Sequence, residues 1–175
     1  MAMVKLVGTI LLIAVSVSCG VMAAGGLRQR LTALRQLRRM LEALRLMIRY
    51  EALEVVQMTA RLADDETLTE LEFIPYINQY AASAVETGGE SFAEAWHRAV
   101  DEHCGSFSKE DIPLIMRTGS VLGVCDCEGQ LQSLAACCAE CDRLIDEAQG
   151  QYQAKGRLYR ALGAVAGALI AVVVI

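Results

Sequence analysis

Apolar residues dominate both ends of the chain, and the N-terminal end is long enough to cross a membrane. No charged residue occurs from Leu6 to Leu27, and Lys5 and Arg28 bound this segment. A helix over these 22 residues would reach about 33 Å at a rise of about 1.5 Å per residue, which covers a hydrocarbon core of about 30 Å. The pattern therefore predicts a transmembrane helix over residues 6–27.

The C-terminal apolar segment is shorter. Its last 15 residues contain only Ala, Gly, Val, Leu and Ile, and as a helix they would reach about 22 Å. A start at Leu158 adds about one turn, and Arg160 can extend its side chain to the headgroups. The pattern predicts a second transmembrane helix over 158–175; the alternative is an amphiphilic tail that lies in the membrane interface.

Between these ends, hydrophobic residues recur at alternating steps of three and four, the period of an amphipathic helix. The spacing predicts one helix over 28–63, a second over 70–86 with Pro75 in its early turns, and a long last helix. No useful length of sequence alternates as a strand would, so an all-α domain is predicted over 28–157. We expect its inward faces to form one core from Leu34, Leu41, Leu44, Trp96, Leu131, Leu134 and Ile145.

Two capping boxes mark shorter helices within this domain. Ser91 with Glu94 would begin one helix, and Ser108 with Asp111 would precede another over 112–118. In each pair the hydroxyl and the carboxylate satisfy backbone N–H groups that a helix start leaves unpaired.

The composition excludes several classes of protein. Hydrophobic residues make up 54% of the chain, aromatic residues 5%, and there are 14 glycines without a three-residue period. A disordered chain would be less apolar, and a small disulfide scaffold would be shorter and richer in cysteine. The chain also has no phosphate-binding glycine loop, no nucleophile elbow and no HExxH motif. We therefore expect no enzyme, no cofactor and no small-molecule substrate.

Basic residues flank the predicted domain at both ends and indicate its side of the membrane. Lys5 alone precedes the first apolar segment, and Lys155 and Arg157 come just before the second. The arginines that follow the first segment are Arg28, Arg30, Arg35, Arg38 and Arg39. Because positive residues remain in the cytoplasm, both termini should lie outside it, which also argues against signal-peptide cleavage near Ala23. The predicted fold is thus all-α, a cytoplasmic helical bundle between two transmembrane helices.

The middle of the chain is strongly acidic. Residues 50–149 carry 20 acidic side chains against 5 basic ones. Anionic headgroups and nucleic acid would repel this part, so it should point into the cytoplasm and bind no nucleic acid. The arginine cluster suits membrane lipids; the alternatives are a solvated helix face that only sets the topology, or a specific lipid or partner contact.

The seven cysteines suit a reducing compartment. Four of them lie between Cys127 and Cys141, where spacing along one helix makes a set of disulfides implausible. Cys138 and Cys141 have the two-residue spacing of a zinc pair, but they fall on the apolar side of a helix. Small buried hydrophobic residues are the favoured interpretation, and no metal site is expected.

A short motif precedes the last helix. Gly119 and Gly123 are expected in a loop, Gly119 as a helix stop and Gly123 at a positive φ or a close-packing position. Asp126 would cap the last helix, and Gln130 could hydrogen-bond back to the loop or outward to a partner. Two interpretations stay open, recognition of a partner and purely architectural turn formation.

These residues carry a family resemblance over essentially the whole chain. The run Gly119-x-x-Leu122-Gly123-x-x-Asp126-x-x-x-Gln130 resembles stage III sporulation protein AB of endospore-forming bacteria. Further support comes from Ile48-Arg49-Tyr50, Ala95-Trp96 and the closing run of glycines and aliphatic residues. The chain departs from the family pattern at Ala52-Leu53, where a Thr-Pro-Leu segment is common, and in its number of cysteines.

The resemblance implies a membrane component of the channel-like complex that joins mother cell and forespore. It implies a cytoplasmic domain similar to that of the platform proteins of type II secretion and type IV pilus systems, located in the mother-cell membrane that faces the forespore. It also implies partners, namely other sporulation channel proteins including a companion ATPase of the secretion type. The competing hypothesis is a membrane-anchored regulator or sensor whose cysteine-rich helix binds metal or responds to oxidation.

Overall fold

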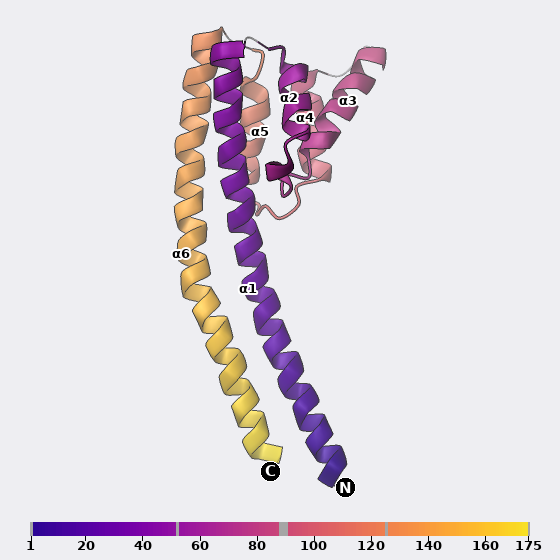
Figure 1. Ribbon diagram of the computed structural model, residues 1–175, viewed down its shortest axis with the longest axis vertical. Coiled ribbons are helices and arrows are strands. Elements are labelled where there is room, and N and C mark those ends of the chain that lie inside the picture. Colours follow the sequence, from indigo (N-terminus) through magenta and orange to yellow (C-terminus); the bar gives the residue numbers. More distant parts are fainter. Residues whose placement is uncertain (1, 52, 88–90, 125, 175) are drawn as a thin grey trace. The chain divides into compact units, whose positions relative to one another are not determined.

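The computed structural model describes the backbone of residues 2–51, 53–87, 91–124 and 126–174, and the side chains of residues 22, 25–51, 53–82, 91–124 and 126–154. Every regular element in these ranges is helical, which confirms the predicted all-α class there (Figure 1). The α-helices are α1 (Ala2–Leu46), α2 (Val55–Ala63), α3 (Ile74–Thr87), α4 (Phe92–Glu102), α5 (Ile112–Val121) and α6 (Cys127–Val174). Two short elements, the π-helix η1 (Met47–Glu51) and the 3-10 helix η2 (Glu66–Leu68), lie on either side of α2 in the sequence.

The chain forms two compact units. Unit 1 comprises Met1–Leu31 and Glu147–Ile175, and unit 2 comprises Thr32–Asp146. The predicted transmembrane segments 6–27 and 158–175 fall in unit 1, and nearly all of their side chains lie outside the described residues. Within the part that is described, no helix is both long and apolar enough to cross a membrane.

The core of unit 2 lies between the helices that the sequence predicted to be amphipathic. Leu34, Leu41, Leu44, Trp96, Leu131 and Leu134 are buried, as expected. The prediction that Ile145 belongs to the core is wrong, because its side chain is only half-buried. The neighbouring Leu144 is buried in its place, with an exposed fraction of 2%. Successive side chains of a helix are rotated by about 100° about its axis. The buried face of α6 therefore contains Cys137, Cys141 and Leu144, and Ile145 lies beside this face.

The predicted helix over 28–63 is interrupted. It ends in the π-helix Met47–Glu51, and Glu54 is extended with φ −66° and ψ 151°. A new helix then begins at Val55, where the side chain of Gln57 accepts a hydrogen bond from the Glu54 backbone N–H at 3.4 Å. The hydrophobic spacing continues through the break, since Met58 and Leu62 are also buried.

The second predicted helix begins four residues later than expected, at Ile74, with Pro75 in its first turn. The preceding residues form turns with partners of their own. Asp65 accepts the backbone N–H of Thr67 at 2.8 Å, and the backbone N–H of Glu70 donates to Gln36 of α1 at 2.7 Å. These hydrogen bonds satisfy backbone N–H groups in the turns that precede α3.

Of the two predicted capping boxes, one is confirmed. Glu94 N–H donates to Ser91 Oγ at 3.3 Å, and Ser91 N–H donates to a Glu94 carboxylate oxygen at 2.7 Å. Ser108 likewise donates from its N–H to Asp111 at 2.8 Å, but Asp111, not Ser108, precedes α5. This helix runs to Val121 and not to 118.

Candidate functional site

The predicted motif before the last helix forms a compact turn. Leu122 is buried, and Gly123 has φ +78°, a value that favours glycine. Asp126 caps α6 by accepting the Gly129 N–H at 3.1 Å, as predicted. Gln130 reaches back and accepts the Gly123 N–H through its Oε1 at 3.3 Å. These side chains therefore hold the turn between α5 and α6 in one conformation.

Gly119 lies inside α5 and not in a loop, so its predicted role as a helix stop is wrong. It is buried against the indole of Trp96. A Cβ atom at this position would lie 2.2 Å from Trp96 Cγ, far inside van der Waals contact. Gly119 is therefore a close-packing position that lets α5 approach α4.

Two other segments meet this turn at the same end of unit 2 (Figure 1). A Cβ atom on Gly123 would lie 3.2 Å from a methyl of Val55 at the start of α2. The thiol of Cys127 lies 3.7 Å from the carbonyl oxygen of Ile48 in η1. The end of α1 with η1, the start of α2 and the α5–α6 turn thus come together.

This end exposes large apolar side chains, which we call the apolar tip. Its members and their exposed fractions are Leu46 at 54%, Tyr50 at 73%, Val56 at 49% and Val124 at 71%. Clustered exposed apolar groups mark interaction sites more often than isolated ones do. The π-helix η1, a rare element that is frequent at functional sites, carries Tyr50. Sequence reasoning missed the tip because its members come from three separate segments.

The five arginines predicted near the membrane have different environments. Arg30, in unit 1, is 8% exposed and donates to Gln151 at 3.3 Å. Arg38, in unit 2, pairs with Glu42 at 2.6 Å and with Asp142 of α6 at 2.8 Å. Arg38 therefore holds α1 against α6. Exposed side chains, which remain candidates for a lipid or partner contact, are those of Arg28, Arg35 and Arg39.

The cysteine-rich face of α6 is packed into the core. Cys137, Cys138 and Cys141 are buried and free, and the Cys141 thiol donates to the Leu34 carbonyl oxygen at 3.5 Å. Burial raises the pKa of Cys137 and Cys138, and it raises the pKa of Cys141 to about 12. Within the described residues, no group of three or more His, Cys, Asp or Glu side chains is placed to hold a metal ion. Cys19 and Cys125 lie outside the described side chains.

We expect the thiols to differ in reactivity. In native full-length protein treated with iodoacetamide at pH 8, the exposed Cys127 should be alkylated, whereas the buried Cys137, Cys138 and Cys141 should be protected. All should react in urea, and peptide mass spectrometry measures both states. Because the neutral Cys141 thiol is favoured by folding, its contribution to stability is complete below pH 9.0 and is lost as the pH rises towards 12. Equal alkylation rates for Cys127 and Cys141 in native protein would contradict the packing described.

Comparisons with known proteins agree with this architecture. A solved structure titled "Stage III sporulation protein AB (SpoIIIAB)" matches with a TM-score of 0.56 and 18% identity, over 71% of this chain and 96% of that chain. That similarity supports the fold. A comparison with curated proteins gave no match. The family model "Stage III sporulation protein AB" matches residues 5–175, nearly the full length, and its description names a stage of sporulation and no reaction. The chain therefore belongs to the stage III sporulation protein AB family.

Proposed function

We propose that this protein is a non-enzymatic, membrane-anchored platform component of the complex that joins mother cell and forespore. In this proposal residues 6–27 and 158–175 anchor the chain in the mother-cell membrane and residues 28–157 face the cytoplasm. The apolar tip then docks a partner protein, and the companion ATPase of the secretion type is the partner that the family resemblance suggests. Family membership supports the sporulation role.

The apolar tip is the observation that carries the docking role. Four large apolar side chains remain exposed there. Asp126 and Gln130 hold the turn that carries Val124, and Cys127 contacts Ile48 in the π-helix that carries Tyr50. Burial of such groups against a partner is favourable by about 25 cal/mol for each Å² of apolar surface. Tyrosine is among the residues that contribute most to protein interfaces, which makes Tyr50 the expected centre.

The structure offers less support to the alternative of a cysteine-based sensor. Such a sensor needs thiols that ionise readily or converge on a metal ion. Burial raises the pKa of Cys137, Cys138 and Cys141, and within the described part of the chain no metal-binding group of three is formed. Packing accounts for these residues.

The test is to replace exposed tip residues without disturbing the core. Tyr50→Ser should lower the yield of heat-resistant spores at least tenfold, because loss of an interface centre typically costs about 2 kcal/mol or more. Val124→Ser should lower the yield by a smaller factor, because valine is seldom an interface centre. Both variants should keep the wild-type melting temperature and membrane level. In vivo cross-linking to the companion ATPase should fall in parallel. Tyr50→Phe, which retains the ring, is the matched control and should sporulate normally.

Asp126→Asn and Gln130→Ala separate the two interpretations of the motif. Asparagine caps helices about as well as aspartate, so Asp126→Asn should leave stability nearly unchanged. If either change abolishes sporulation at normal stability, these residues themselves recognise a partner. If function falls only with stability, they are scaffold. Normal sporulation in both Tyr50→Ser and Val124→Ser would overturn the docking role of the apolar tip.

A further inference from the structure

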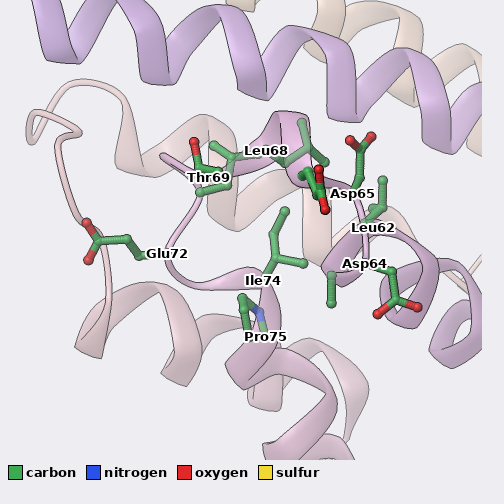
Figure 2. Close-up of a pocket in the computed structure, with 11 residues that line it drawn as sticks. Leu62, Asp64, Asp65, Leu68, Thr69, Glu72, Ile74 and Pro75 are labelled. Atoms are coloured by element: carbon green, nitrogen blue, oxygen red, sulfur yellow. The ribbon is translucent and has the colours of Figure 1, made fainter.

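A cavity opens on unit 2 between the end of α2, the short helix η2 and the start of α3 (Figure 2). Its volume is about 200 Å³. Leu62, Leu68, Leu71 and Ile74 line it, and all four are buried in the core. The cavity therefore offers an apolar floor wide enough for one long side chain.

The rim of this cavity is acidic. Asp64, Asp65, Glu66 and Glu72 line it, and no basic residue does. Figure 2 shows Asp64 and Asp65 on one side of Ile74 and Pro75, and Glu72 on the other side with its carboxylate directed away from them. The C-terminal end of α2, at Ala63, adds the negative end of a helix dipole to the same place.

The chain supplies little positive charge to balance this rim. Arg61, the basic residue in the last turn of α2, pairs with Glu51. Hydrogen bonds from Thr67 lower the pKa of Asp65, and the positive charge of Arg39 adds a smaller effect in the same direction. Over the described residues, Asp64, Glu66 and Glu72 form no ion pair.

The geometry of the cavity favours a basic side chain over a metal ion. Nowhere in the described part of the chain do three potential ligands converge on one point as a metal ion requires. The carboxylates of Asp64 and Asp65 instead lie beside an apolar floor. Lysine and arginine match such a site, because their methylene stems pack on apolar surface while the charged head remains at the rim.

We propose that this cavity is a docking site for a basic side chain, lysine or arginine, presented by a partner protein. The stem lies on Leu68 and Ile74, and the head lies beside Asp64 and Asp65. The site is separate from the apolar tip. It gives the domain a second contact, which depends on charge and therefore on salt.

The test uses full-length protein in nanodiscs of zwitterionic lipid, with isotope-labelled Leu and Ile methyl groups. Acetyl-Leu-Lys-amide should shift the methyl signals of Leu68 and Ile74 along a saturable curve, and raising the salt from 0.05 to 0.5 M should weaken the binding. Asp64→Asn should weaken it about two- to fivefold, the range for an exposed ion pair. Asp101→Asn, which removes an exposed carboxylate elsewhere, is the matched control and should change nothing.

Ala63→Leu tests the apolar part of the site. Ala63 is an exposed residue that lines the cavity, so leucine there should fill the floor without altering the charges and should abolish the shifts. Equal shifts from acetyl-Leu-Glu-amide would overturn the proposal. So would calcium chloride if it displaced the lysine probe at equimolar concentration, since the site would then select a metal ion. Lysine-probe shifts confined to methyl groups outside the cavity would also overturn it.

Discussion

Gly119→Ala is expected to destabilise unit 2 by about 3 kcal/mol, the upper end of the usual cost of overpacking a core. Three atoms of the Trp96 indole lie 2.2 to 2.6 Å from the position of the new Cβ. A rigid, fully buried ring has no free end that can swing away. Alanine favours a helix over glycine by about 1 kcal/mol, which is too little to compensate. Thermal unfolding followed by circular dichroism measures the change.

Gly150→Ala is the matched control. Gly150 also lies within a helix, but its added Cβ would meet nothing within 4 Å. That variant should be unchanged or more stable by up to about 1 kcal/mol. If the clash with Trp96 is the cause, Gly119→Ala combined with Trp96→Leu should be less destabilised than the sum of the two single changes. Additive effects would show that Gly119 matters for another reason.

Leu134→Ala and Leu41→Ala are each expected to cost about 2–5 kcal/mol, because both remove a fully buried side chain and leave a cavity. Leu41 lies on α1 and Leu134 on α6, so each tests the packing from one side. Chemical denaturation of the full-length protein measures the free energy of unfolding.

Leu46→Ala provides the control on α1. It removes the same atoms from a side chain that is 54% exposed, so its cost should stay within about 0.5 kcal/mol. Unchanged stability in Leu134→Ala and Leu41→Ala would mean that these hydrophobic faces of α1 and α6 do not form the core. A large loss in Leu46→Ala would show that the apolar tip is packed and not exposed.

Hydrophobic spacing predicted which residues are buried better than where helices end. Leu34, Leu41 and Leu44 could be assigned to the core because a three-and-four period fixes one face of a helix. The same period runs on to Met58 and Leu62, so it gave no sign of the break at Glu54. That break depends on local backbone geometry and on the Gln57 cap, which periodicity does not record.

The motif from Gly119 to Gln130 was predictable only where it depends on local chemistry. The capping role of Asp126 and the positive φ of Gly123 follow from local chemistry, and both are present. The role of Gly119 depends on Trp96, 23 positions earlier in the sequence, and only the packing of α4 on α5 reveals it. The apolar tip could not be predicted either, since Tyr50 and Val124 lie on segments that come together only after folding.

The burial of Trp96 also gives the protein a built-in optical reporter. It is the single tryptophan of the chain, it is fully enclosed, and its indole N–H donates to the Ile115 carbonyl oxygen at 2.9 Å. An indole in such a dry environment emits at shorter wavelength than one in water. Its emission therefore records the contact between α4 and α5 without any label, in the whole protein and in the presence of lipid or partner. A ligand that loosens the packing of these helices would shift the Trp96 emission to longer wavelength.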